Sequence, residues 1–103
     1  NEKLVENAKK VGEHLKFQLN QIQDEYPKLI NNVRGLGLMC SFDLPTPELR
    51  NHFRDNCYKE KLMILGCGEK SIRFRPPLNI TENEIDKGLT IIRKVLSFVS
   101  SNN

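Results

Sequence analysis

Two arginines near the end of a short extended segment are the residues of this chain best suited to chemistry. Arg73 and Arg75 follow a loop at 66–68 that two glycines frame, and they alternate with Ile72 and Phe74. Because alternate side chains of a strand point to opposite faces, the apolar pair can face a core while both guanidinium groups point away. A guanidinium offers a planar fork of donors that fits a carboxylate or a phosphate. The pattern is typical of an anion-binding face, and also of a solvated outer strand face, which is the more common case.

The other candidate groups do not assemble into a recognisable centre. Cys67 stands between two glycines, without a second cysteine or a histidine at metal-ligand spacing, so a zinc site is not expected. Cys40 and Cys57 fall on apolar faces and are predicted to be core residues. His14 and His52 lie on predicted helices, where solvent exposure is expected for both. The sequence therefore predicts no catalytic residue and no metal site in this chain.

Length and composition indicate one small globular domain. The chain has 103 residues, of which 28% are charged and 38% hydrophobic, and this suits a folded domain with a single core. Its net charge of +3 is scattered, whereas nucleic acid and anionic membrane usually require a concentrated basic surface. No apolar run reaches the length of a membrane span, and the first residues do not resemble a secretory signal. Three widely spaced cysteines indicate reduced thiols, as in the cytoplasm or the mitochondrial matrix.

A long amphipathic helix is predicted over residues 1–25. Apolar residues recur every three or four positions and form one stripe, which consists of Leu4, Ala8, Val11, Leu15, Leu19 and Ile22. The helix is expected to end before Tyr26 and Pro27. It lacks a start signal, which indicates that the chain continues a longer protein.

The segment after this helix is predicted to be one extended strand, from about Arg34 to Phe42. Its residues alternate between apolar types and small or polar types. Gly35 and Gly37 fall on the same face and leave it bare, so a ligand or another backbone could approach closely. A bulge or a crossing point within the fold explains the two glycines equally well.

Two more helices and two more strands complete the predicted order. Pro47 opens a helix, and the threonine before it is suited to cap that helix. Short strands are predicted over 61–65 and 72–75, with a turn at 66–68 between them. The motif at 81–84 is a capping box, which predicts the start of a last amphipathic helix.

These elements predict an α+β fold, in which a small three-stranded, mostly antiparallel sheet carries helices on one face. The other face of such a sheet is open. It would carry Gly35 and Gly37 of the first strand and Arg73 and Arg75 of the third, and it must lie against something else.

Two motifs complete the sequence argument. One runs from Val33 to Met39, and the other runs from Gly66 to Leu78. Together with the order of the elements, they resemble the C-terminal domain of class-III pyridoxal-phosphate-dependent aminotransferases over nearly the whole chain. The Arg-Phe-Arg-Pro form at 73–76 resembles the branch that contains L-lysine 6-aminotransferase and 4-aminobutyrate aminotransferase. The Pro-Pro-Leu ending favours the lysine enzyme, whereas the Gly-Cys-Gly loop favours the 4-aminobutyrate enzyme.

The resemblance implies that residues 1–103 are a single domain from the C-terminal end of a larger, homodimeric enzyme. Residues 1–25 would form an interdomain helix, and residues 33–99 would form the core of the small domain. The implied reaction moves an amino group from an amino acid to 2-oxoglutarate, with the ε-amino group of L-lysine as the favoured donor. The implied cofactor is pyridoxal phosphate, and it does the electronic work of the transfer.

The resemblance also implies roles for single residues. Arg73 matches an arginine that binds a substrate carboxylate. For Arg73, the resemblance therefore favours an anion-binding role over a solvated side chain. Arg75, Gly35 and Gly37 would lie at the domain interface or line the site. The family's cofactor-binding lysine and phosphate-binding residues belong to a large catalytic domain that this chain lacks. The chain alone is therefore expected to be inactive and not to bind the cofactor natively.

Two alternatives stay open. Most of a ferredoxin-like pattern is present, and such sheets often bind RNA or regulatory ligands. RNA-binding sheets stack bases on exposed aromatic side chains, whereas Phe42 and Phe74 are predicted to face the core. A dimerisation domain would follow if the open faces of two sheets paired with each other.

Overall fold

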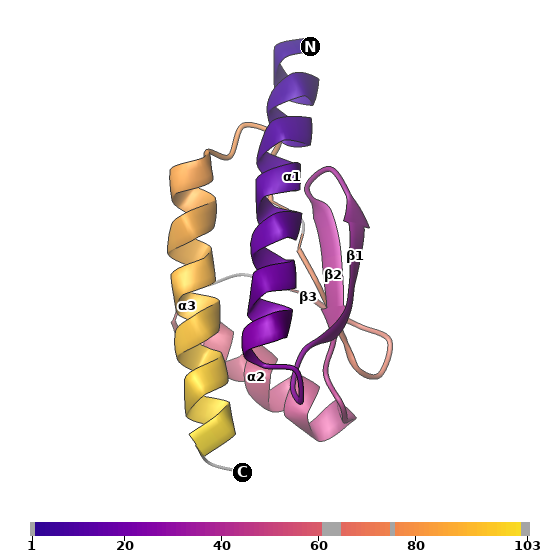
Figure 1. Ribbon diagram of the computed structural model, residues 1–103, viewed down its shortest axis with the longest axis vertical. Coiled ribbons are helices and arrows are strands. Elements are labelled where there is room, and N and C mark those ends of the chain that lie inside the picture. Colours follow the sequence, from indigo (N-terminus) through magenta and orange to yellow (C-terminus); the bar gives the residue numbers. More distant parts are fainter. Residues whose placement is uncertain (1, 61–64, 75, 102–103) are drawn as a thin grey trace.

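The computed structural model describes residues 2–60, 65–74 and 76–101 (Figure 1). Within these ranges the chain forms three helices and four strands, in the order α1 (Glu2–Glu25), β1 (Asn31–Leu36), β2 (Met39–Asp43), α2 (Pro47–Lys59), β3 (Leu65–Cys67), β4 (Ser71–Arg73) and α3 (Glu82–Ser101).

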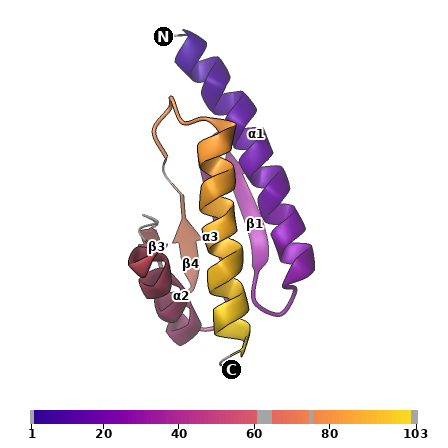
Figure 2. The same ribbon diagram turned by 90° about the vertical axis from the view of Figure 1, so that its left-hand side faces the viewer.

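The described strands form one antiparallel sheet in the order β1-β2-β4-β3. All the described helices lie on one side of it: α1 and α2 pack on the sheet, and α3 lies between these two helices (Figures 1 and 2). The predicted α+β class, with helices covering one face of a small antiparallel sheet, is therefore confirmed.

The segment that was expected to be one strand is a β-hairpin, so the described sheet has four strands where three were predicted. β1 and β2 pair with Leu36 opposite Met39, on either side of a turn at Gly37 and Leu38. Gly37 has a φ of +56°, in the left-handed region that favours glycine in such turns. Leu38 lies within the turn and is buried. The alternation of apolar residues therefore continues through the turn, so the sequence pattern does not reveal the turn.

The two glycines of this hairpin do not share a bare face. Gly35 pairs with Cys40, which is buried on the helix side, and a Cβ at Gly35 would overlap the backbone of Met39. Gly37 lies against α1, where a Cβ on Gly12 would overlap the Gly37 carbonyl group. The glycines therefore mark close crossings within the fold, which was the alternative explanation. Their predicted role at an interface or site stays a prediction.

The strands after α2 also differ in their bounds from the prediction. β3 begins at Leu65 and includes Gly66 and Cys67, so the turn follows at 68–70 rather than at 66–68. β4 begins at Ser71, one residue earlier than predicted. The other residues of the predicted second strand, 61–64, and Arg75 lie outside the described residues.

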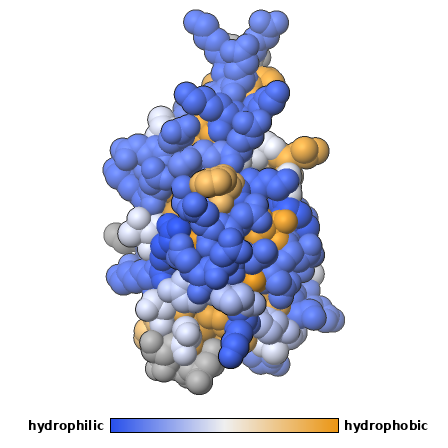
Figure 3. Space-filling view, viewed as in Figure 1, coloured by the Kyte–Doolittle hydropathy of each residue, from blue (hydrophilic) through white to orange (hydrophobic). Residues whose placement is uncertain are grey.

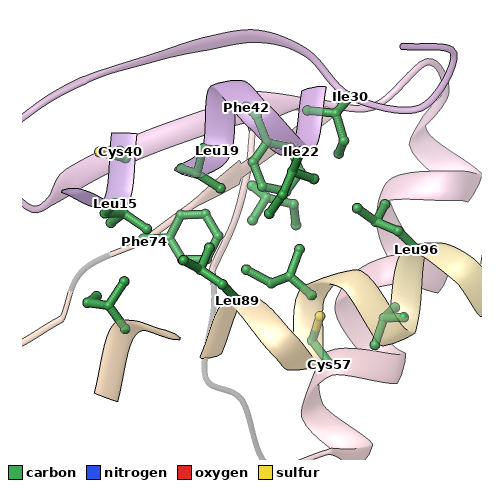
Figure 4. Packing of buried hydrophobic residues seen from close by; sticks show 14 of the residues in the cluster. Leu15, Leu19, Ile22, Ile30, Cys40, Phe42, Cys57, Phe74, Leu89 and Leu96 are labelled. Carbon is green, nitrogen blue, oxygen red and sulfur yellow. The ribbon is translucent and has the colours of Figure 1, made fainter. Parts of the chain in front are cut away.

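The core fills the space between the helices and the sheet (Figure 4). Phe42 lies at its centre, with ring centroids 5.7 Å from Phe53 and 5.8 Å from Phe74. Cys40 and Cys57 are buried as predicted, and burial raises the pKa of the Cys57 thiol to about 12. The α1 stripe is buried from Ala8 onward. Leu4 is exposed instead, because the first turns of α1 extend beyond the rest of the domain (Figure 1).

Both predicted helix starts are confirmed. The Thr46 hydroxyl accepts a hydrogen bond from the Leu49 amide at 3.1 Å, which caps α2. At α3 the Glu84 amide donates to the Thr81 hydroxyl at 3.2 Å, and the Thr81 amide donates to the Glu84 carboxylate at 3.3 Å. These caps fix where α2 and α3 begin. In the sequence, β4 with Arg73 lies between these two helices.

Candidate functional site

The face of the sheet that points away from the helices carries Arg73. Ile72 and Phe74 are buried toward the helices, as predicted, so the half-buried Arg73 between them points to the open face. Strand pairing puts Arg73 opposite Ser41, and Ser41 opposite Arg34. Directly opposed residues share a face of a sheet. The three residues therefore form a row across β1, β2 and β4.

The sequence did not single out Arg34 or Ser41 of this row, and Arg34 is the charged residue of the two. Its Nη1 lies 3.0 Å from an Asp43 carboxylate oxygen, and its Nη2 donates to the Ser71 hydroxyl at 3.2 Å. The sequence offered a usable signal, because an arginine and an aspartate stand on opposite sides of the Gly37 turn. The prediction of one continuous strand hid this pairing, because a straight strand keeps the side chains of Arg34 and Asp43 far apart.

Asp43 collects the polar contacts at this end of the open face. Its carboxylate accepts hydrogen bonds from the Ser71 hydroxyl and from the Asn32 amide group, in addition to the Arg34 guanidinium. Burial by itself would raise the pKa of the Asp43 carboxyl. The hydrogen bonds and the positive charge of Arg34 outweigh burial, so the pKa lies below its ordinary value. Asp43 therefore stays ionised and ties β1 and β4 to β2.

A buried arginine holds the turn that precedes Arg73. Arg50 of α2 is only 9% exposed, and its Nη1 donates to the carbonyl oxygens of Gly68 and Ser71, each at 3.2 Å. Its Nε donates to the Asn51 side chain at 2.8 Å. The sequence did not single out Arg50, because it stands directly after Leu49, at the edge of the apolar stripe of this helix, where a solvated side chain is the usual expectation.

The open face becomes apolar toward the hairpin turn. Leu36 and Met39 form the last pair of the hairpin, and both are exposed, by 88% and 53% of their surface. They lie two residues beyond Arg34 and Ser41 along the strands, on the same face. The face thus combines an ionic network, the Arg73 row and an exposed apolar pair. The side of the molecule seen in Figure 3 is, by contrast, mostly hydrophilic, with apolar atoms in small patches.

An apolar cavity among the described residues lies elsewhere. It has a volume of about 230 Å³ and is bounded by residues of α1 and α3 together with Phe74, Pro76, Pro77 and Ile80. Its lining is apolar apart from Glu84. The described lining suits a hydrocarbon group, and none of its residues is a cation that could hold a phosphate or a carboxylate.

The described residues contain neither a metal-binding cluster nor a membrane-spanning helix. No group of three or more histidine, cysteine, aspartate or glutamate side chains within the described ranges is placed to hold a metal ion. In the same ranges, no helix is both long enough and apolar enough to cross a membrane.

The chain belongs to the class-III aminotransferase family, whose model matches residues 1–96. It is 36% identical over 95 residues to an L-lysine-epsilon aminotransferase from Amycolatopsis lactamdurans, a match that covers 91% of this chain. It is 38% identical over 96 residues to the mitochondrial 4-aminobutyrate aminotransferase of Homo sapiens, with 93% of this chain covered. A solved lysine aminotransferase from M. tuberculosis matches with a TM-score of 0.92 and 34% identity over 95% of this chain.

These relatives are much longer than the chain. The matched parts are 21% of the Amycolatopsis protein, 19% of the human protein and 22% of the solved M. tuberculosis chain. The chain therefore spans about a fifth of the length of the relatives that it matches. Its similarity to the class-III aminotransferases, expected from the two motifs, is confirmed.

The class-III aminotransferase family generally depends on pyridoxal phosphate. A site for it needs a lysine in a sheltered pocket, because burial lowers the pKa of the amine and makes it nucleophilic, together with donors for a phosphate. Every lysine that the structure describes is exposed, and none of the described residues that line the apolar cavity is basic. The described residues therefore do not fit the cofactor by themselves.

Proposed function

We propose that this chain is the C-terminal small domain of a transaminase, and that Arg73 binds the carboxylate of its substrates there. The observation that carries the proposal is the position of Arg73 on the open face, in one row with Ser41 and Arg34. The amino group would pass from an amino acid to 2-oxoglutarate, which is a dicarboxylate.

An arginine suits this role because its fork of donors matches the two oxygens of a carboxylate. Arg73 stands on a strand whose neighbours Ile72 and Phe74 are buried, so its backbone is held by the core. The ionic network around Asp43 further braces the start of the same strand through Ser71. A braced arginine orients a substrate at little entropic cost.

The partner of the open face would be the large catalytic domain of the parent chain. The exposed pair Leu36 and Met39 supports this, because adjacent exposed apolar side chains indicate a contact surface. That domain would supply the lysine that carries pyridoxal phosphate and the groups that bind its phosphate. Arg75, Gly35 and Gly37 would lie at or near the same interface, and the parent enzyme would be a homodimer.

L-lysine is the favoured amino donor, and its ε-amino group would be transferred. The Pro76-Pro77-Leu78 ending supports this choice, as does the similarity to L-lysine-epsilon aminotransferases. 4-Aminobutyrate is the alternative donor, supported by the 38% identity to the human 4-aminobutyrate enzyme. Turnover of the full-length protein with each amine and 2-oxoglutarate distinguishes the two, since the products are different aldehydes.

The parent enzyme would work in the cytoplasm or the mitochondrial matrix. Two described cysteines, Cys40 and Cys57, are free thiols, which a reducing compartment preserves. The human relative is named as a mitochondrial enzyme, which supports the second location.

Replacing Arg73 by lysine in the full-length protein tests the substrate role. Lysine keeps the charge but loses the fork, so kcat/KM should fall by one to two orders of magnitude, or about 1–3 kcal/mol. The measurement is steady-state kinetics with the amine and with 2-oxoglutarate. Arg54→Lys is the matched control, because Arg54 contacts only its neighbour Asp55 among the described residues. Unchanged KM and kcat for both substrates of Arg73→Lys would exclude the role.

A further inference from the structure

Arg50 is a charged side chain in an unusually apolar position. It is 9% exposed and stands in α2 one turn before the buried Phe53. Its hydrogen-bond partners within the described part of the chain are neutral: two backbone carbonyl groups and the Asn51 side chain. Burying a guanidinium is costly, and neutral acceptors offset this cost less well than a carboxylate does. An apolar residue would fill this position at lower cost, so the hydrogen bonds of Arg50 are the feature that distinguishes it.

The two carbonyl groups flank one turn. Gly68 and Ser71 are the residues at the two ends of the β3–β4 turn, and one nitrogen of Arg50 binds both. Gly68 has a φ of +60°, in the left-handed region that glycine adopts readily, which suits it to this turn. Arg50 therefore closes this turn from α2.

Ser71 is held a second time, from the open face. Its hydroxyl donates to Asp43 and accepts from Arg34, while its carbonyl oxygen accepts from Arg50. Ser71, the first residue of β4, is thus bound from both sides: by Arg50 of the helix layer and by side chains of the sheet. Arg73 follows two residues later, and its side chain points to the same face as that of Ser71. Any shift of the turn would move Arg73 along or out of the row.

We propose that Arg50 is a positioning residue for substrate binding: by joining the Gly68 and Ser71 carbonyl groups, it sets where Arg73 presents its guanidinium. This inference rests on the proposed function of Arg73. Arg50 itself is buried behind the strand and touches no substrate. Its effect should therefore appear only with substrates whose carboxylate Arg73 binds.

The test uses the full-length transaminase and two amino acceptors. One acceptor is 2-oxoglutarate, and the other is a short aliphatic aldehyde without a carboxylate. The readout is the ratio of kcat/KM for the two acceptors, because a loss of folded or cofactor-loaded enzyme lowers both values equally and leaves the ratio unchanged. The variants are Arg50→Met, which keeps the packing and removes the donors, Arg50→Lys, and Arg54→Met as a control on the same helix.

Arg50→Met should lower the ratio by about 10- to 100-fold, the scale of loss that a misplaced binding group produces. Arg50→Lys should restore part of it, since an ammonium group can still donate to a carbonyl oxygen. Arg54→Met should leave the ratio as it is. In an Arg73→Ala background, Arg50→Met should cause no further change, because the group that it positions is gone.

Each contrary result has a distinct meaning. If Arg73→Ala lowers the ratio and Arg50→Met does not, or if the two effects multiply, the positioning role is wrong while the proposed function stands. If Arg73→Ala leaves the ratio unchanged, both proposals fail. If neither Arg50 variant folds, Arg50 serves the stability of the domain as a whole, and the positioning role is overturned.

Discussion

Asp43 shows how a single side chain organises the open face. It accepts hydrogen bonds from residues of two neighbouring strands, and its pKa is lowered because these bonds and the Arg34 charge outweigh partial burial. A lowered pKa in the folded state means that the ionised carboxylate stabilises the fold. This contribution is complete above the ordinary pKa of 3.8, and it is lost as the pH falls through the lower pKa of the folded chain.

Asp43→Asn should therefore make the chain less stable at neutral pH by about 1 kcal/mol, since the amide keeps the shape but loses the charge. The same variant should lose less stability than the original chain when the pH is lowered to about 3. Urea unfolding at the two pH values measures both effects. Asp24→Asn, on the exposed side of α1, is the control. If Asp43→Asn lost as much stability on acidification as the original chain, Asp43 would not be the titrating group.

At the scale of elements, two glycines form a close contact between α1 and the hairpin. Gly12 of α1 lies directly against the carbonyl group of Gly37 in the β1–β2 turn. This contact allows α1 to approach the hairpin, and Lys16 one turn later donates to the Gly35 carbonyl oxygen at 3.2 Å. The position of α1 on the sheet thus depends on a missing side chain, which hydrophobic patterning does not reveal.

Gly12→Ala should destabilise the chain by about 1–3 kcal/mol, because the new methyl group would overlap backbone atoms that cannot simply rotate away. Alanine is the better helix former by roughly 1 kcal/mol, so Gly12→Ala would make the chain more stable if the contact were absent. Chemical unfolding followed by circular dichroism decides between the two. Glu13→Ala, at an exposed neighbouring position, serves as the control and should change stability little.

At the scale of the whole molecule, the described residues form one core beneath an open sheet face. The chain has the fold of the matching part of a lysine aminotransferase, but it spans only about a fifth of that protein. Within the described residues, the exposed lysines and the apolar cavity do not together make a site for pyridoxal phosphate. The division of work that we propose follows: this domain orients the carboxylate, and the catalytic domain holds the cofactor.

Mixing the 103-residue chain with pyridoxal phosphate should therefore give no absorbance band of a cofactor bound to one sheltered lysine. Slow reaction spread over several exposed lysines is the expected result, because their amines share similar solvated surroundings. Absorbance spectra, followed by borohydride reduction and peptide mapping, measure this. A stable adduct on one defined lysine would contradict the proposed division between the domains.

Local patterns determined much of this protein from the sequence alone. The apolar stripes of α1 and α3, the Thr46 cap, the capping box at Thr81 and the inward direction of Ile72 and Phe74 each depend on residues within a turn or two of one another. The family similarity came from two short motifs in the same way. Such features follow from periodicity and local hydrogen bonding, so they can be predicted without knowing which segments meet.

The tertiary structure decided the features that depend on pairing between distant segments. The hairpin was missed because an unbroken alternation of residues fits both a strand and a tight turn with a buried Leu38. Strand register then placed Arg34 in the row of Arg73, and the packing of α2 brought Arg50 to the Gly68 carbonyl group, 18 residues away in the sequence. These contacts join residues whose spacing has no period, so only the folded chain shows that they meet.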